Sequence, residues 1–255
     1  MTDQPNNFVH LHVHSQYSIL DGQASIQRLV DKAMADGMPG IALTDHGNMF
    51  GVKEFYNYVK SCNGKKHDKI KRLRKLSSAL DTLLKEHADP QEYLSQLQAE
   101  AKSLEAAKDE SAESAEAYVK VKNRLDEAEA SGKEFGFDPA QAAAKIADLE
   151  AIPDFKPIIG CEVYVARRRL SDKKVKEDQS GYHLILLAKN AKGYHNLIKI
   201  VSKAWTEGFY MRPRTDRAEL EKYHEGLICC SACLGGEVPK HITCLLYTSP
   251  SPRDS

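Results

Sequence analysis

The sequence predicts an α/β fold, a parallel sheet or β/α barrel whose two parts are separated by an inserted α-helical hairpin or bundle. Short apolar strands alternate with amphipathic helices in two separate parts of the 255-residue chain, which is the pattern of parallel sheets and barrels. The segment between these parts is rich in Ala, Glu, Lys and Leu, a helical composition. We therefore expect residues 1–60 and 154–243 to form the barrel and residues 61–153 to form the insertion.

The first part of the chain has the pattern strand, helix, strand, helix. Residues 8–13 predict a short strand, and apolar side chains recur at helical spacing over residues 26–33. A Gly-Met-Pro sequence at residues 37–39 ends that helix. Residues 41–43 predict an apolar strand, and residues 52–59 a further helix. Because such folds place their chemistry at the carboxyl ends of strands, the polar residues that follow these strands are candidates for function.

The insertion contains three amphipathic stretches, at residues 70–84, 94–104 and 118–128. Asp89-Pro90 separates the first stretch from the second, and the polar residues 108–114 predict a turn before the third. Basic residues also gather in this segment, at Lys65, Lys66, Lys69, Lys71, Arg72, Arg74 and Lys75. They could follow a phosphate backbone, but basic residues on an amphipathic helix are more often a solvated outer face.

The later part of the chain returns to the alternating pattern, with strands predicted at residues 157–165, 182–188 and 227–231 and a helix at residues 194–204. The pattern stops after Pro239. The last residues, 244–255, accumulate Ser and Pro without periodicity and resemble a translated vector or adapter sequence. We expect this tail to be foreign to the fold.

Composition indicates a globular protein that stays in the cytoplasm. Lys plus Arg and Asp plus Glu number 36 each, so contact with nucleic acid must come from local patches. No stretch reaches the roughly 18 to 20 apolar residues that a membrane span requires, so we expect no membrane partner. The six cysteines lack the spacing of a secreted disulfide framework, and we expect most of them to be free thiols.

The most informative motif is HLHVHS, which contains His10, His12 and His14. In a strand, residues two apart project from the same face, so these imidazoles would share one side. A His-x-His pair at a strand end can bind one metal ion through both rings. The alternative is that the histidines are hydrogen-bonded packing residues.

Further polar residues in apolar surroundings strengthen the metal hypothesis. They are Asp21 in ILDG, His46 in LTDHGN, Glu162 in IIGCEVYVA, His183 in GYHLILLA and Cys233 in SACLGGE. A carboxylate within a buried strand is costly unless it is paired or coordinated, so Glu162 predicts a nearby cation. His183 fits less well, because a parallel barrel would place a ligand at the far end of its strand.

These motifs resemble the PHP (polymerase and histidinol phosphatase) family. Within that family, five ordered blocks are most similar to the bacterial DNA polymerase III alpha subunits: HLHVHSQYSILDG, GMPGIALTDHGNMFGVKEFY, KPIIGCEVYVA, HLILLAKNAKGYHNLIKIVSKAWTEGFY and LICCSACLGGEVP. The resemblance covers nearly all of the chain outside the insertion and the tail. It implies an incomplete, distorted seven-stranded (β/α)7 barrel.

The resemblance also implies a cluster of two or three metal ions, and nitrogen and thiolate ligands mixed with carboxylate indicate zinc or manganese. Carried over position by position, the ligands are His12, His14, Asp21, His46, Glu162, His183 and Cys233, with His12, His14 and Glu162 as the catalytic group. Asp45 is implied as a residue that orients His46, and His10 as a packing residue. The family's last ligands lie in a later Asp-x-His motif, so we expect this chain to end before them.

The function implied is that of the N-terminal part of a replicative DNA polymerase III alpha subunit, a DNA-directed DNA polymerase. This domain would act as a 3′–5′ exonuclease in the full-length protein, and magnesium would serve a polymerase domain that lies outside the chain. DNA, the proofreading subunit and the sliding clamp are the implied partners, and we expect the chain alone to be inactive. Arg212 and Arg214, in GFYMRPR, are candidate phosphate contacts.

Two other functions remain open. One is a free-standing PHP phosphatase that acts on a small phosphomonoester. The other is a purely structural module, with the insertion as a docking arm for replisome partners. The long insertion and the GYHNL and EGFYMRPR blocks favour the polymerase subunit, and a metal analysis would separate the structural module from the enzymes.

Overall fold

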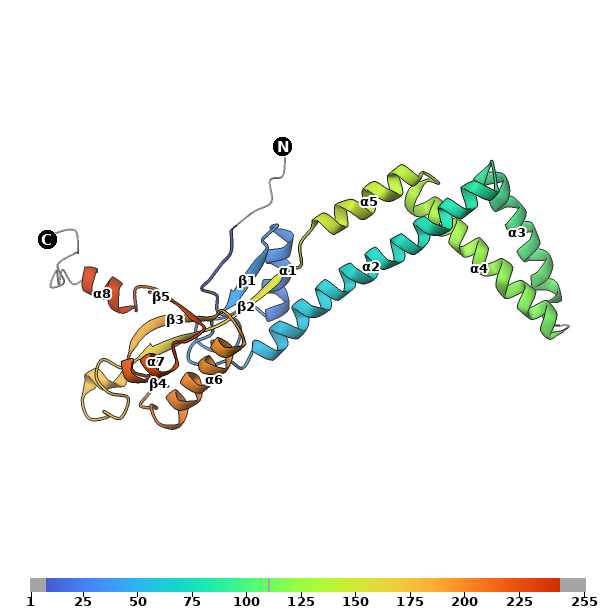
Figure 1. The fold of residues 1–255 in the computed structure, drawn as a ribbon. Helices are drawn as coiled ribbons and strands as arrows, with labels where there is room; N and C mark the ends of the chain where they lie inside the picture. The colour runs from blue at the N-terminus through green and yellow to red at the C-terminus, as the bar shows by residue number, and fades with distance from the viewer. Residues whose placement is uncertain (1–7, 110, 244–255) are drawn as a thin grey trace. The chain divides into compact units, whose positions relative to one another are not determined.

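The computed structural model describes residues 8–109 and 111–243, which divide into two compact units (Figure 1). One unit comprises Met1–Ser61 and Asp154–Ser255, and the other comprises Cys62–Pro153. Each unit has hydrophobic clusters of its own. The tail at residues 244–255 lies outside the described residues.

The first unit contains a mixed sheet. Its described strands are β1 (Gly40–Leu43), β2 (Lys156–Val165), β3 (Tyr182–Ala188), β4 (Arg214–Thr215) and β5 (Leu227–Cys230). The sheet has the order β1-β2-β3-β5, and β4 also pairs with β2. β1 and β4 run parallel to β2, as expected, but β2 with β3 and β3 with β5 are antiparallel. The prediction of an all-parallel sheet is therefore wrong for β3 and β5.

Residues 8–13 do not form the predicted strand. They run beside β1, where Ala42 N–H donates to the His10 carbonyl and Thr44 N–H donates to the Val13 carbonyl, both at 2.9 Å. Between these two hydrogen bonds, the segment from His10 to Val13 advances three residues while β1 and its continuation advance two, from Ala42 to Thr44. The extra residue interrupts the regular hydrogen-bond ladder of a β-sheet.

The helices of this unit are α1 (Ile26–Ala35), the beginning of α2 (Val52–Glu86), the short 3-10 helix η1 (Lys176–Gln179), α6 (Ala191–Thr206), α7 (Arg217–Tyr223) and α8 (Glu237–Thr243). α1 begins at the N-cap Ser25, and Gly37 follows its end with φ +71°, a conformation that favours glycine. α2 continues far beyond the predicted end at Val59.

β2 has a hydrophobic cluster packed against α6 on one face and the candidate site on the other. Its alternate side chains Cys161, Val163 and Val165 are buried in a cluster with residues of α6. Because successive side chains of a strand point to opposite faces, Glu162 and Tyr164 point away from this cluster. Both are also buried, so the candidate site is built around a buried carboxylate on the other face of the sheet.

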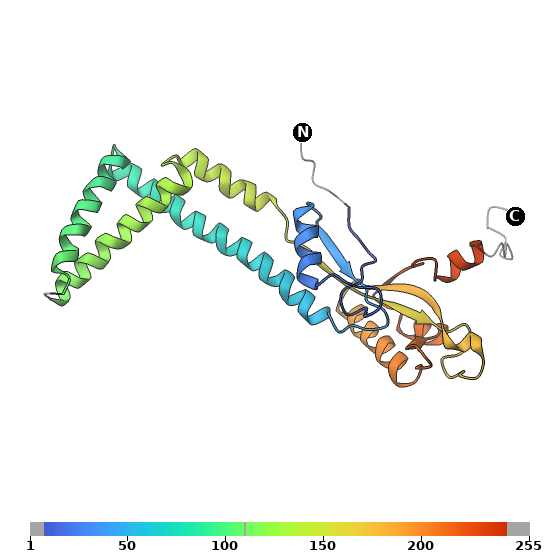
Figure 2. The same ribbon diagram turned by 180° about the vertical axis from the view of Figure 1, so that it is seen from behind.

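The second unit is helical, as the composition predicts. It contains the rest of α2, then α3 (Pro90–Ala107), α4 (Ala112–Phe135) and α5 (Pro139–Ala151). Asp89 caps α3 and Ser111 caps α4, so the predicted breaks are confirmed. α3 and α4 lie side by side in both views (Figures 1 and 2).

Several residues of the basic run at 65–75 pair with acidic residues of the same helical unit. The ion pairs are Arg72–Glu134 at 3.1 Å, Arg74–Glu150 at 2.8 Å and Lys75–Glu127 at 2.8 Å. Exposed pairs of this kind contribute little to stability. They nevertheless give these basic side chains acidic partners within their own unit. This arrangement favours the solvated outer face over a phosphate track.

No helix in the described parts of the chain is both long enough and apolar enough to cross a lipid bilayer. The cysteines among the described residues are free thiols, as predicted. Cys161 is buried, and burial raises the pKa of its thiol. Cys229, on β5, is exposed.

Candidate metal centre

The candidate ligands meet at Glu162. Its side chain is fully buried, and its main chain is fixed on both sides by the segment that follows β1. The Glu162 N–H donates to the Asp45 carbonyl at 3.1 Å, and the Glu162 carbonyl accepts from Gly47 N–H at 2.8 Å. His46, which lies between these two residues, is thereby held directly beside Glu162.

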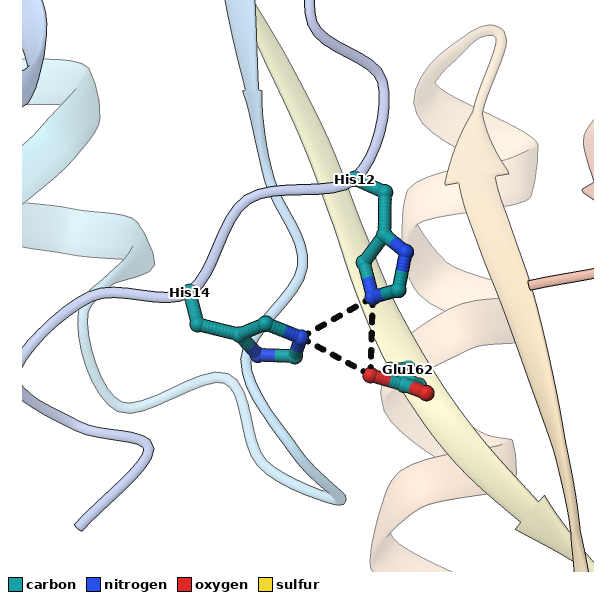
Figure 3. A group of neighbouring side chains, drawn as sticks. All are labelled: His12, His14 and Glu162. Carbon is teal, nitrogen blue, oxygen red and sulfur yellow. Dashed lines mark hydrogen bonds and ion pairs between the residues drawn. The ribbon is translucent and has the colours of Figure 1, made fainter. Parts of the chain in front are cut away.

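His12 and His14 point toward this carboxylate from the segment beside β1 (Figure 3). Each Nε2 atom lies 2.9 Å from Glu162 Oε2, and the two Nε2 atoms are 2.9 Å apart. His10 does not join them: its ring lies edge-on to Phe8, with ring centroids 4.7 Å apart. The prediction that the three imidazoles share one side is therefore right for His12 and His14 and wrong for His10, because the segment is not a regular strand.

His46 joins the centre from the turn after β1, and Asp21 lies at its outer edge. His46 Nε2 is 2.7 Å from Asp21 Oδ2, and His46 Nδ1 is 3.2 Å from Glu162 Oε2. The His46 ring stacks on the His14 ring, with centroids 4.1 Å apart. The Asp21 side chain is 60% exposed, so this side of the centre faces solvent.

The antiparallel direction of β3 explains the position of His183. Because β3 runs opposite to β2, its first residues lie beside the last residues of β2, with His183 opposite Tyr164. His183 Nδ1 is therefore 2.6 Å from Glu162 Oε1. Cys233 follows β5, and its Sγ lies 3.5 Å from His183 Nδ1 and 3.8 Å from Glu162 Oε1.

A hydroxyl network behind the centre contains two residues that the sequence analysis missed, Ser15 and Ser18. Buried Asp45 accepts hydrogen bonds from Ser15 N–H at 2.7 Å, Ser15 Oγ–H at 2.8 Å and Ser18 Oγ–H at 2.7 Å. Ser18 Oγ also accepts from His46 N–H and lies 3.0 Å from His14 Nδ1. These contacts connect Asp45 through Ser18 to the His14 ring and also to the His46 main chain, whereas the resemblance implied Asp45 only as a residue that orients His46.

This network fixes the proton of His14. Because Ser18 donates its only hydroxyl proton to Asp45, its oxygen must accept from His14 Nδ1–H. A neutral His14 then has an unprotonated Nε2, the form that binds a metal ion. That lone pair faces the oxygen of Glu162 at 2.9 Å, an arrangement that calls for a cation between the two atoms.

Burial and the surrounding imidazoles set the charges of the centre. Burial alone would raise the pKa of the Glu162 carboxyl, but the His14, His183 and His12 imidazoles around it together hold this pKa well below its usual range. Burial lowers the pKa of His46, although Glu162 opposes the change. Glu162 is therefore a carboxylate and His46 is favoured in its neutral form, as metal ligation requires.

The donor atoms fit a first-row metal ion. Among the residues that the structure describes, two groups have ligand atoms within 4.8 Å of one another: His12, His14 and Glu162, and His46, Glu162 and His183. Glu162 belongs to both. The buried His46 Nδ1 atom lies 3.2 Å from Glu162 Oε2 without forming a hydrogen bond to it, and a buried polar atom left in this way is costly unless another group, such as a cation, satisfies it. Nitrogen and carboxylate donors with a nearby thiol suit zinc or manganese better than calcium.

The two arginines proposed as phosphate contacts differ in the structure. Arg214 is fully buried, and its guanidinium donates to the carbonyls of Gly208, Leu170 and Asp172. The structure therefore removes Arg214 from the candidate contacts, because its donors are occupied within the fold. Arg212 is exposed, and its Nη1–H donates to the Tyr164 hydroxyl at 2.9 Å.

Tyr164 places Arg212 next to the centre. Its ring meets the His183 ring edge-on, with centroids 5.1 Å apart, and the Arg212 guanidinium lies 5.1 Å from the Tyr164 ring centroid. Burial raises the pKa of the Tyr164 hydroxyl, although Arg212 opposes the change. The hydroxyl is therefore neutral near neutral pH, and the exposed Arg212 side chain lies beside the centre.

Replacing Gly235 with Ala is expected to weaken cation binding by about 10- to 100-fold, the range for disturbed ligand supports. A Cβ atom at this position would lie 2.9 Å from His183 Cγ and Nδ1, so the ring would have to shift from its present place beside Glu162. Calorimetric titration with zinc or manganese measures the effect. Gly64→Ala is the control, because a Cβ there meets nothing within 4 Å. Equal affinities in the two variants would contradict this role for His183.

Comparisons with known proteins agree with the resemblance. A family model described as PHP domain matches residues 10–74 and 121–251. The chain is also similar to proteins named DNA polymerase III subunit alpha, with 34% identity over 240 residues in Borreliella burgdorferi, 33% over 236 in Treponema pallidum and 30% over 239 in Thermus aquaticus. These alignments cover 93%, 91% and 92% of this chain, but only 13%, 12% and 12% of the relatives.

Proposed function

This chain belongs to the PHP domain family, and from that premise we propose that it is the metal-binding phosphoesterase region of a bacterial DNA polymerase III alpha subunit. We infer that it removes nucleotides from the 3′ ends of DNA. The observation that supports this most strongly is the convergence of His12, His14, His46 and His183 on the buried Glu162 carboxylate.

His12, His14 and Glu162 form the catalytic group in this proposal, and Asp21, His46, His183 and Cys233 complete the ligand set for two or three zinc or manganese ions. A divalent cation bound there would lower the pKa of a bound water and neutralise charge on the phosphoryl oxygens. Ser18 keeps the proton of His14 on Nδ1 and leaves Nε2 free for ligation.

Arg212 is the proposed contact for the substrate phosphate. It is the exposed cation that Tyr164 holds beside the ligand cluster, and charge-assisted bonds from arginine fix phosphate groups in register. The net charge of the chain is zero, so a local cation of this kind is needed for an anionic substrate.

The relatives support a wider proposal. We propose that the mixed sheet belongs to a distorted seven-stranded barrel, and that the complete protein is a cytoplasmic DNA-directed DNA polymerase in DNA replication. In that protein magnesium would serve a separate polymerase domain. The partners would be DNA, a proofreading subunit and a sliding clamp.

The test measures the polarity of DNA cleavage. Single-stranded DNA labelled at its 5′ end is incubated with manganese or zinc and with the complete subunit that we propose to contain this chain. The expected result is stepwise shortening from the 3′ end, which a chelator stops. The double variant His12→Ala, His14→Ala is expected to lose this activity, while the DNA polymerase activity of the same protein serves as its folding control.

Other outcomes identify the alternatives. Hydrolysis of p-nitrophenyl phosphate without shortening of DNA would favour the phosphatase of small phosphomonoesters. Bound metal without hydrolysis of either substrate would favour the structural docking module. Either result would contradict the exonuclease.

A further inference from the structure

We propose that a pocket beside the candidate metal centre receives the unpaired terminal base of a single-stranded DNA substrate. This inference rests on the proposed function, since it assigns a subsite to the same nucleic-acid substrate. It concerns residues that the metal centre does not use: Phe50, Trp205 and Phe209.

The pocket has a volume of about 380 Å³ and lies between the loop after β1 and the last turns of α6. Its walls are mainly apolar and include Met49, Phe50, Ile198 and Trp205, while Ser202 adds a polar group. Apolar walls of this kind can hold a flat ring.

Exposed aromatic rings mark this pocket. Phe50 is 69% exposed and Trp205 is 44% exposed, although both side chains are large and apolar. Phe209, itself 45% exposed, stacks on Trp205 with centroids 5.5 Å apart and an interplanar angle of 18°. A fixed aromatic ring with part of its surface open to solvent can stack a nucleobase.

Hydrogen bonds fix both walls of the pocket to the metal centre. The Trp205 Nε1–H donates to the Gly47 carbonyl at 2.7 Å, one residue after His46. The Asn48 amide donates to the His46 carbonyl at 3.0 Å and accepts from Phe50 N–H at 3.1 Å. The Trp205 ring and the Phe50 main chain are therefore held near His46, and a base stacked between them would lie close to this ligand.

The chemistry of the surroundings identifies the occupant. A DNA strand end carries a flat base and a phosphodiester, and the pocket offers aromatic rings while Arg212 offers a cation beside the same cluster. A base within a duplex has both faces stacked, so only an unpaired base can enter a pocket of this kind. The pocket thus selects a frayed or single-stranded end, where the terminal base is free.

The experiment uses Trp205 as its own reporter, because the chain contains one tryptophan. The chain is titrated in chelator with a short oligothymidylate and with an abasic strand of the same length, and tryptophan fluorescence is recorded. The thymidylate is expected to quench the fluorescence and the abasic strand is not. Equal quenching by both strands would overturn the proposal, because the contact would then come from the backbone alone.

Variants separate stacking from folding. With a labelled oligothymidylate, Phe50→Ser and Trp205→Ala are each expected to raise the dissociation constant roughly tenfold, the usual effect of losing one stacking ring. Trp205→Phe, which keeps a ring, is expected to retain most of the affinity. Val119→Ser, at a 53% exposed position in the helical unit, is the control. Because the Phe50 side chain is mostly exposed, Phe50→Ser decides the question even if Trp205→Ala fails to fold.

An affinity for oligothymidylate that is unchanged in Phe50→Ser would overturn the proposed base pocket. This measurement needs neither bound metal nor cleavage, so its failure is distinct from that of the exonuclease. A chain that binds thymidylate through these rings but cleaves nothing would refute the proposed reaction and leave the base pocket intact.

Discussion

Replacing Glu162 with Gln is expected to lower the affinity for zinc or manganese by more than about 100-fold, since even residues that only support a ligand contribute about 10- to 100-fold. The substitution keeps the size of the side chain but removes the charge that four imidazoles approach within 3.2 Å. Both ligand groups contain this carboxylate, so both lose affinity together. Competition with a chromogenic chelator measures the change.

Glu100→Gln is the matched control for this substitution, because Glu100 is exposed on α3 of the helical unit. Its affinity for the metal should equal that of the unaltered chain. If Glu162→Gln and Glu100→Gln bound metal equally well, Glu162 would not be the shared ligand and the centre would have to be abandoned.

Replacing Asp45 with Ala is expected to lower the free energy of unfolding by about 2–4 kcal/mol, because buried donors that lose their acceptor each cost about 1–3 kcal/mol. Three donors would be affected, the Ser15 amide and the hydroxyls of Ser15 and Ser18. The freed Ser18 hydroxyl would no longer fix the proton of His14, so metal affinity should fall by about 10- to 100-fold as well.

Denaturant unfolding in chelator measures the first effect of Asp45→Ala, and metal titration measures the second. Asp81→Ala, at an exposed position of α2, should change neither. Loss of stability without loss of metal affinity would show that the hydroxyl network supports the fold alone.

The helices and strands were largely predictable, because their apolar spacing is visible in the sequence. The strand predicted at residues 182–188 matches β3, and the helix expected at residues 26–33 lies within α1. The strand predicted at residues 8–13 is absent from the structure. Alternation of side chains does not reveal whether a neighbouring strand can pair with the segment in register.

The predicted direction of β3 was wrong for a different reason. An apolar run of residues is compatible with a parallel or an antiparallel strand, so its sequence contains no information on direction. The connection between β2 and β3, residues 166–181, did contain a signal. It holds only the short η1, whereas a parallel connection needs a longer crossover, usually an α-helix.

The chemistry of the site was visible where polar residues interrupt apolar runs, as Glu162 does in β2. Its support was not visible, because Ser18 is a common loop residue and only the fold places its hydroxyl between His14 and Asp45. The burial of Arg214 was equally hidden, since the sequence does not show which arginine finds carbonyl partners inside the fold.

The most direct test of the metal centre is anomalous diffraction from crystals of the protein grown with zinc, recorded on both sides of the zinc absorption edge. We expect anomalous peaks about 2.0–2.2 Å from His12 Nε2, His14 Nε2 and a Glu162 carboxylate oxygen. A crystal saturated with zinc that shows no peak within coordinating distance of Glu162 would contradict the account.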